Sequence, residues 1–472
     1  MASPRLSALL LSALASTVFL ATAPTAAAQQ WPEDGRGQGL FNKEWHEGRR
    51  QALMETFLEK ATDKDGVIIL RGAGAQNDYR EFRQDNNFWY FTGITTPNAV
   101  YVCVPSTGEE FLLLPLVNPQ EERWLGDLIS PEEGREYTTI AKVTKLSKNG
   151  VRGKSGNLEA LLEKLAEKHK TFYVQRQPAE NWMMSRDNLL SAKADVLNDR
   201  FDGRTNRGDQ FGKILAETYE VEVQDLTLML DNLRLKKTPE EVAAMRRACE
   251  ISGEAHVHAM KTSVPGEYEW QVGARMTGKM LELGAMGPAY LAIVGSGPSA
   301  CILHYPQANQ KLEKEHVVMI DYGAEYRHYV ADISRSWPVG EKFTERQAEV
   351  YQAVYDAQEA AFAACKPGAT LGQVGNAAQR VIRDRGFGIM WHGVSHWLGM
   401  ATHDVGAYRM RLEPGMVFTV EPGIYLPEEG IGVRIEDVVL ITEDGFELLS
   451  SSIPRKLSEI EALRAQAWGG AE

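Results

Sequence analysis

The sequence predicts two folded domains, an α/β layer domain followed by an α+β domain. At 472 residues the chain is longer than one hydrophobic core usually supports. In its first half, apolar or β-branched runs alternate with helical patterns. In its second half, helices are interleaved with strand pairs that read as antiparallel, which favours an α+β arrangement over a parallel doubly wound sheet.

The elements of the first domain, placed at residues 40–225, can be taken in order. A helical pattern covers residues 44–61, and strands are expected at 66–70, 99–104 and 110–114, before a helix at 158–168. A helical segment of mixed charge over 211–233 leads to the domain boundary. The second domain, at 235–455, opens with a helix to residue 262, because Thr238 can cap it and Pro239 suits its first position. A further helix is expected at 344–365, where Thr344 is followed by Gln347.

Residues 1–28 have the pattern of a secretory signal peptide. Arg5 precedes an apolar run from residue 6 to 20, and three alanines at 26–28 form a small-residue cleavage site before Gln29. An uncleaved membrane anchor is the alternative, but the run is short and is closed by Pro24. We therefore expect export to the periplasm or the medium, with no membrane association after cleavage.

Composition and charge narrow the function classes. The formal net charge of −13 argues against nucleic acid as a partner, since nucleic-acid binders usually carry a basic surface. Neither a GxGxxG in a strand-turn-helix setting nor a P-loop occurs, so nucleotide chemistry has little support. The four cysteines include no CxxC pair and are expected to be mostly buried thiols.

Two acidic residues stand at the ends of a predicted hairpin. An apolar run leads into Asp321, and the returning strand passes through Asp332. With a turn centred near residues 326–327 the two carboxylates would face each other on one side of the sheet. Close carboxylates repel, and a bound cation would relieve that repulsion. For this pair alone, a solvated hairpin with two exposed acids is an equally good interpretation.

Two glutamates and a group of histidines extend this pattern. Glu421 ends an apolar strand before a Pro-Gly turn, and alternation places Arg434 and Glu436 on one face of another strand. Taken singly, each glutamate could be an ordinary strand-end charge. Of the ten histidines, three (His392, His396 and His403) fall within thirteen residues, a concentration typical of a metal or proton-transfer site. Taken alone, His304 would be interpreted as a packed or surface residue. It becomes a candidate site residue only because the other candidate residues occur in the same chain.

Two aspartates, two glutamates and one histidine form a ligand set that suits hard divalent cations. Oxygen-rich ligand sets of this type favour manganese, with zinc or cobalt as alternatives, over a thiolate zinc site. Two ions could hold a hydroxide between them as nucleophile and polarise a carbonyl. The predicted ligands are Asp321, Asp332, His396, Glu421 and Glu436.

The chain resembles the creatinase and aminopeptidase P family of pita-bread metallopeptidases. The resemblance spans residues 40–455, and includes the runs at 88–93, 293–297 and 412–416 and the histidine signature at 392–404. It implies an α+β pita-bread catalytic domain preceded by a smaller α/β creatinase-like N-terminal domain. The implied reaction is removal of the N-terminal residue from peptides with proline in second place, by two metal ions and a bridging hydroxide.

Roles for individual residues follow from the resemblance. It assigns the same five metal ligands, with Asp332 and Glu436 bridging the ions and Glu421 also acting as proton acceptor. His304 and His403 would stabilise the tetrahedral intermediate, His392 would line the pocket for the residue after the scissile bond, and Arg434 would anchor the hydrogen bonding. Trp89 resembles an aromatic residue that reaches a neighbouring subunit's site, which implies a homo-oligomer.

Three other functions are compatible with this fold. Prolidase, which cleaves Xaa-Pro dipeptides, uses the same ligands, but Ser395 and Trp397 resemble the aminopeptidase signature more closely. The short spacings from His403 to Glu421 and from there to Glu436 leave the preferred peptide length open. A non-catalytic binding module or a metal-free creatinase-like hydrolase is disfavoured, because either would leave several carboxylates crowded without a cation.

Overall fold

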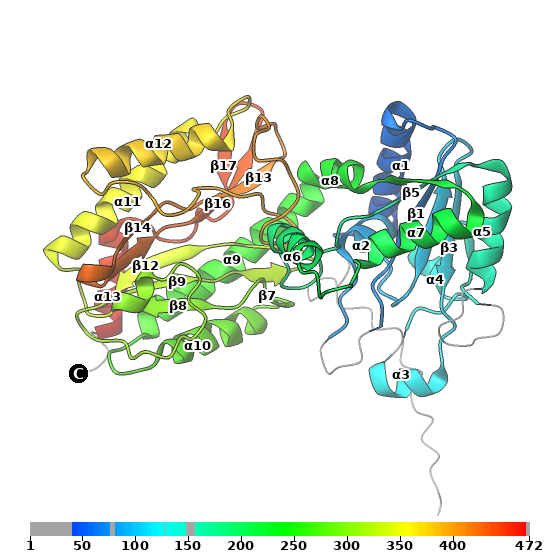
Figure 1. The fold of residues 1–472 in the computed structure, drawn as a ribbon. Coiled ribbons are helices and arrows are strands. Elements are labelled where there is room, and N and C mark those ends of the chain that lie inside the picture. The colour runs from blue at the N-terminus through cyan, green and yellow to red at the C-terminus, as the bar shows by residue number, and fades with distance from the viewer. Residues whose placement is uncertain (1–39, 76–80, 127, 148–155, 469–472) are drawn as a thin grey trace, which may run out of the picture.

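The computed structural model describes residues 40–75, 81–126, 128–147 and 156–468, which form two halves side by side (Figure 1). The segment expected to be a signal peptide, residues 1–28, lies outside the described residues. Within the described ranges, no helix combines the length and apolar character needed to cross a bilayer. All four cysteines are buried free thiols, as the sequence predicted.

The N-terminal half is built on a mixed six-stranded sheet in the order β4-β3-β2-β1-β5-β6. Successive side chains of the central strand β1 pack alternately into two hydrophobic cores, one on each face of the sheet. Val67 and Ile69 pack with apolar residues of α5 and α7, whereas Ile68 and Leu70 pack with those of α1, α2 and α8. Both faces of the sheet are thus covered by helices, as an α/β layer domain requires. The strands are β1 (Val67–Arg71), β2 (Val100–Val104), β3 (Glu109–Leu114), β4 (Lys142–Lys145), β5 (Thr171–Val174) and β6 (Glu222–Asp225).

Eight helices accompany this sheet in the described part of the first half and in the connection to the second. They are α1 (Lys43–Lys60), α2 (Asn86–Thr92), α3 (Pro119–Leu125), α4 (Gly134–Tyr137), α5 (Gly156–Lys168), α6 (Arg186–Asn198), α7 (Arg207–Tyr219) and α8 (Thr227–Leu235). The prediction of a single helical segment over 211–233 is wrong, because α7 ends at Tyr219 and the edge strand β6 precedes α8. Three of the four residues of β6 are polar or charged, so no apolar alternation marks it as a strand.

The C-terminal half places antiparallel strands between two helix pairs, α9 with α10 and α11 with α12 (Figure 1). The sequence predicted this α+β arrangement. Thr238 and Glu241 form a capping box at the start of α9, and Thr344 and Gln347 form another at the start of α11, so both helices begin where expected. The helices are α9 (Pro239–Thr262), α10 (Glu269–Glu282), α11 (Glu345–Ala364), α12 (Leu371–Asp384) and α13 (Leu457–Trp468), with 3-10 turns η1 (Gly297–Cys301) and η2 (Pro427–Glu429).

The strands of this half belong to four small sheets, and every recorded pairing between them is antiparallel. Three sheets have the orders β11-β10-β7, β12-β9-β8 and β13-β16-β17, and the fourth pairs β14 with β15. The strands are β7 (Gly287–Pro288), β8 (Ile293–Ser296), β9 (Val317–Asp321), β10 (Ala324–Tyr326), β11 (Tyr329–Val330), β12 (Ser334–Pro338), β13 (Val417–Val420), β14 (Gly423–Leu426), β15 (Ile431–Arg434), β16 (Asp437–Ile441) and β17 (Phe446–Leu448).

The hairpin that carries Asp321 and Asp332 is present, but its register differs from the prediction. Tyr326 pairs with Tyr329, so the turn lies at Arg327 and His328, one residue later than expected. Both turn residues have positive φ, 49° and 71°, as a two-residue primed turn requires. Asp321 consequently pairs with Ser334, two residues beyond Asp332. The two carboxylates are diagonal neighbours rather than a directly opposed pair.

A buried network of charged groups joins the two halves. Arg234 of α8 donates to Glu180 Oε2 at 3.1 Å and also pairs with Asp404 of the catalytic half. Arg186 pairs with Glu180 as well, and its guanidinium binds Asp231 through two hydrogen bonds of 3.0 and 2.9 Å. Because nearly all of these groups are removed from water, each depends on its partners to offset the cost of burial.

Replacing Arg234 by alanine should therefore destabilise the protein strongly. The change leaves the carboxylates of Glu180 and Asp404 buried with less counter-charge, a loss that typically costs about 3 to 5 kcal/mol. Denaturant unfolding measures it, with Arg346→Ala as control, since the exposed pair of Arg346 with Glu429 should contribute about 1 kcal/mol or less. Equal costs for the two variants would show that the network is not what holds the halves together.

Candidate metal centre

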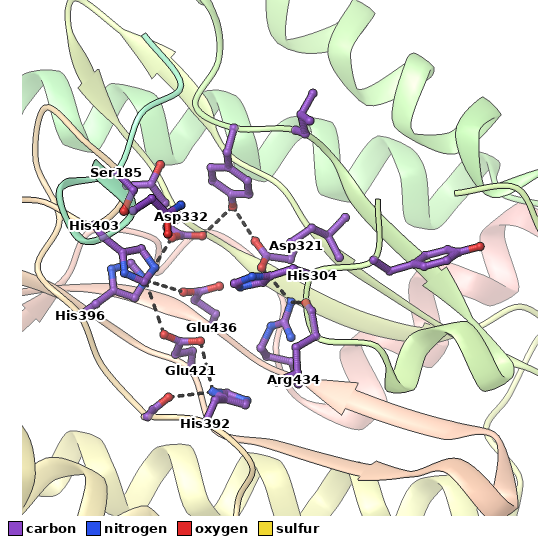
Figure 2. Close-up of a pocket in the computed structure, with 18 of the residues that line it drawn as sticks. Ser185, His304, Asp321, Asp332, His392, His396, His403, Glu421, Arg434 and Glu436 are labelled. Atoms are coloured by element: carbon purple, nitrogen blue, oxygen red, sulfur yellow. Dashed lines mark hydrogen bonds and ion pairs between the residues drawn. The ribbon is translucent and has the colours of Figure 1, made fainter. Parts of the chain in front are cut away.

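The five predicted ligands converge because strands end, or pass closely, at one place (Figure 2). Asp321 is the last residue of β9, and Glu421 directly follows β13. Glu436 lies between β15 and β16, and its backbone N–H donates to Ser334 O at 3.0 Å. The segment carrying His396 runs along β13, where His396 and Thr419 exchange hydrogen bonds of 3.0 and 3.2 Å. The side chains therefore meet on a rigid framework.

The imidazole of His396 lies at the centre of the acidic group. Its Nε2 is 3.3 Å from Asp332 Oδ2, 3.5 Å from Glu421 Oε1 and 3.9 Å from Glu436 Oε1. One donor atom from each of Asp332, His396 and Glu436 lies within 4.8 Å of the others, close enough to share a single cation.

Asp321 completes the group through Tyr290. The phenol oxygen of Tyr290 is 2.6 Å from Asp321 Oδ1 and 2.6 Å from Asp332 Oδ1. The other oxygen of Asp321 accepts a hydrogen bond of 2.7 Å from Arg434 Nη2. All five predicted ligands are thus brought together, with Asp321 on the side that Tyr290 and Arg434 face.

Arg434 organises the surrounding hydrogen bonds. Its Nε donates to Ser334 Oγ at 2.8 Å, and Ser334 in turn donates to Glu436 Oε2 at 2.8 Å. Its Nη1 donates to Tyr425 Oη at 2.9 Å. As the alternation predicted, Arg434 and Glu436 lie toward the same cavity. Such partners orient ligands and matter nearly as much as the ligands do.

Burial shifts the pKa values of the acidic group, because little positive charge lies beside the carboxylates. Desolvation raises the pKa of Asp321 to about 6 and that of Glu421 to about 7, and it raises the pKa of Glu436 well above its ordinary value. For Asp332 the hydrogen bond and charge of His396 outweigh desolvation, and its pKa is lowered. The same bond, with the charge of Glu421, raises the pKa of His396 to about 9 against the effect of burial. A bound cation would lower these raised pKa values, because it would supply positive charge beside the carboxylates.

The donor set fits divalent metal ions. It offers carboxylate oxygens and one imidazole nitrogen, with no thiolate. Hard cations prefer such ligands, and their charge would offset the repulsion that raises the carboxylate pKa values. Arg434 pairs with Asp321, whereas Asp332, His396 and Glu436 turn donor atoms toward one another, so that a cation could take the place of the proton that His396 shares with Asp332.

The other three histidines predicted at the site, His304, His392 and His403, line a cavity of about 760 Å³ above this group. The His403 ring stacks on that of His396, with centroids 3.9 Å apart and planes 9° apart. His392 Nε2 is 2.8 Å from Tyr425 Oη, and its Nδ1 is 3.6 Å from Glu421 Oε2. Burial, followed by the charge of Arg434, lowers the pKa of His304, so its imidazole is neutral near pH 7. All three positions agree with a role at a bound substrate.

Trp89 does not belong to this site. The expectation that it reaches a neighbouring subunit is wrong, because its side chain is only 5% exposed and packs inside its own chain. Its ring lies 3.9 Å from that of His328 and 5.3 Å from that of Phe41. An indole enclosed in this way completes a core instead of extending from the surface.

Several residues at the site were not expected from the sequence. Ser334 could have been found, since it stands two residues from Asp332 on one strand face. Tyr290 and Tyr425 come from segments without a distinguishing pattern. The hydrogen bond of 3.1 Å between His403 Nδ1 and Asp187 Oδ2 joins residues 216 positions apart.

Four carboxylates and an imidazole close the base of a cavity that lies among antiparallel strands. This arrangement is typical of a metal-dependent hydrolase. The model for metallopeptidase family M24 matches residues 243–443, and that for the aminopeptidase P N-terminal domain matches residues 46–173. The chain belongs to family M24, in the group that carries the aminopeptidase P N-terminal domain.

Relatives and solved structures agree with this placement. The Xaa-Pro aminopeptidase of Escherichia coli is 32% identical over 455 residues, which cover 89% of this chain and 97% of that protein. Human Xaa-Pro aminopeptidase 3 is 29% identical, covering 89% and 85% of the two chains. The structure of aminopeptidase P from Escherichia coli with the inhibitor Pro-Leu has a TM-score of 0.75 at 29% identity, covering 91% of this chain and 99% of the other. That of aminopeptidase PepP from Pseudomonas aeruginosa has 0.74 at 30%, with the same coverage.

The metal-free protein should lose stability as the pH rises from about 5 to 8. A carboxylate whose pKa is raised by folding stabilises the folded state below its ordinary pKa, and that contribution disappears as the pH passes the raised value, here about 6 for Asp321 and about 7 for Glu421. Divalent cations compete with these protons, so manganese should raise the unfolding temperature more at pH 8 than at pH 5.

Thermal unfolding at the two pH values, with and without manganese, measures this effect. Glu421→Gln serves as the matched variant, because a neutral amide of similar shape should weaken the pH dependence of the metal-free protein. His396 contributes in the same direction, because its stabilising proton is lost from the unfolded state above its ordinary pKa of 6.5 while the folded state keeps it up to about 9. A manganese effect that is the same at both pH values would contradict the assignment of these acids to a cation site.

Proposed function

We propose that the chain is a Xaa-Pro aminopeptidase, which uses divalent metal ions to release the N-terminal residue from peptides with proline in second place. The observation that carries this proposal is the similarity to the Escherichia coli Xaa-Pro aminopeptidase, which extends over 89% of this chain and so includes both halves. The grouping of Asp332, His396 and Glu436, with the neutral His304 lining the same cavity, supports a catalytic function.

Prolidase activity is the alternative on the same fold. The Xaa-Pro dipeptidase of Pyrococcus furiosus is 38% identical, but over 229 residues that cover only 48% of this chain. The higher identity is thus confined to one part of the chain, whereas the aminopeptidase similarity continues through the rest.

The side chains around the cavity divide the work of hydrolysis. Bound divalent ions would polarise the scissile carbonyl and lower the pKa of water. Glu421 lines the cavity and offers a carboxylate that can accept a proton from water. His304 and His403 line the cavity and can donate hydrogen bonds to an oxygen on which negative charge develops. Arg434 keeps Asp321 and, through Ser334, Glu436 in fixed orientations.

A peptide bond to proline calls for a dedicated site. Proline has no backbone N–H and its φ is fixed, so enzymes that bind that N–H or need another backbone shape cannot accept it. His392 and Tyr425, joined by a hydrogen bond of 2.8 Å, stand beside Glu421 and could form one wall for the proline ring. This position supports the role that the family resemblance implies for His392.

The natural metal, the assembly state and the location complete the proposal. Manganese suits the oxygen-rich ligands. A homo-oligomer remains the expectation from the family resemblance, although Trp89 does not support it, and light scattering that gives a monomer mass would overturn it. Export is proposed from residues 1–28, and N-terminal sequencing of protein secreted by its host should begin at Gln29.

Hydrolysis of Xaa-Pro-Yaa tripeptides, compared with Xaa-Pro dipeptides, tests the activity. We expect the manganese-loaded protein to cleave tripeptides. Asp332→Ala should lose at least about 100-fold in kcat/KM, because it removes both a predicted metal ligand and the partner of His396 Nε2. Cleavage of dipeptides alone would establish prolidase activity instead. Cleavage of neither, with manganese demonstrably bound, would overturn the proline-peptidase proposal and favour a binding module.

A further inference from the structure

Asp187 comes from the N-terminal half but contacts the histidine loop of the catalytic half. It is the second residue of α6, the helix that lies between the two halves in Figure 1. Its Oδ2 is 3.1 Å from His403 Nδ1 and accepts a second hydrogen bond of 2.8 Å from the Tyr408 hydroxyl. Both partners line the cavity above the metal ligands.

The position of Asp187 is fixed by its neighbour. The backbone N–H of Arg186 donates to His403 O at 2.8 Å, so the chain of α6 is bonded directly to the residue that Asp187 contacts. The Arg186 guanidinium is held by Asp231 and Glu180 in the buried charge network. These contacts of Arg186 hold the start of α6 against the histidine loop and so bring the Asp187 carboxylate to the imidazole.

The contact determines which ring nitrogen carries a proton. An ionised carboxylate can only accept hydrogen bonds, and the bond from His403 is the main reason that the pKa of Asp187 is lowered, so this carboxylate is ionised at neutral pH. The proton of a neutral His403 ring must then be on Nδ1. The opposite nitrogen, Nε2, is left for the cavity, while the face of the ring is held against His396.

We propose that Asp187 is a positioning residue for His403, which holds the imidazole in its Nδ1–H form and aims Nε2 at the substrate. The inference rests on the proposed function, since it gives His403 a part in peptide hydrolysis. It also gives the N-terminal half a direct role in the chemistry of the catalytic half. A carboxylate that orients a histidine from behind is a recurrent arrangement in enzymes whose histidine transfers protons.

Kinetics of Asp187→Ala and Asp187→Asn on an Xaa-Pro-Yaa tripeptide test the inference. We expect Asp187→Ala to lower kcat about 10- to 100-fold with little change in KM, as loss of an orienting partner typically does. Asp187→Asn keeps an oxygen that can accept the Nδ1 proton, so its kcat should lie between those of the wild type and the alanine variant. Asp195→Ala removes the same charge from an exposed position on α6 and is the matched control, expected to retain wild-type kcat.

Nitrogen-15 NMR of histidine-labelled, metal-free full-length protein gives a readout that does not depend on activity. At about pH 8 the His403 signals, assigned with His403→Gln, should show the Nδ1–H form in the wild type and a shift toward Nε2–H in Asp187→Ala. Should the alanine variant fail to fold, the wild-type spectrum and Asp187→Asn still decide the question.

Three results would overturn the inference. They are an Nε2–H form of His403 in the wild type, a raised KM with unchanged kcat in Asp187→Ala, and an equal loss in Asp195→Ala. Absence of tripeptide cleavage by the wild type would instead refute the proposed function, and the NMR result would then still report on the contact between Asp187 and His403.

Discussion

The crowding of four buried carboxylates around His396 is the constraint on which the rest of the structure depends. Arg434 and the protonated His396 supply positive charge next to them, and desolvation raises the pKa of three of the four acids. Such a group is costly in a folded protein unless cations bind to it. The antiparallel strands, the hydrogen bonds of Tyr290 to two of the acids and the fixed guanidinium of Arg434 all serve to hold these charges in one place.

The N-terminal half contributes more than a cover for this site. Through Glu180 and Arg186 it enters a buried ion network with Arg234 and Asp404, and Asp404 directly follows His403 in the chain. The same segment carries Asp187 to the His403 ring. The loop that stacks His403 on His396 is therefore held from one side by its own domain and from the other by the first half. This coupling agrees with the similarity of the whole chain, rather than the catalytic half alone, to Xaa-Pro aminopeptidases.

Local patterns in the sequence were sufficient for the strands that carry the ligands and for the capped helices. Acids that end apolar runs, such as Asp321 and Glu421, and the boxes at Thr238 and Thr344 are visible within a few residues. Features set by contacts between distant segments were not predicted. The partners of Asp321 and Asp332 include Tyr290, 31 and 42 positions away. The hairpin register depended on which two residues could adopt positive φ, and the burial of Trp89 depended on His328 in the other half.

Metal stoichiometry is the most direct test of the central claim, that the buried acidic group is a site for two divalent cations. Calorimetric titration of the metal-free chain with manganese, checked by elemental analysis after gel filtration, should give about two ions per chain in the wild type. Glu436→Gln, which changes a carboxylate within 4.8 Å of both Asp332 and His396, should reduce that number or weaken binding at least about tenfold. Binding of no manganese, or binding that Glu436→Gln leaves unchanged, would contradict the account.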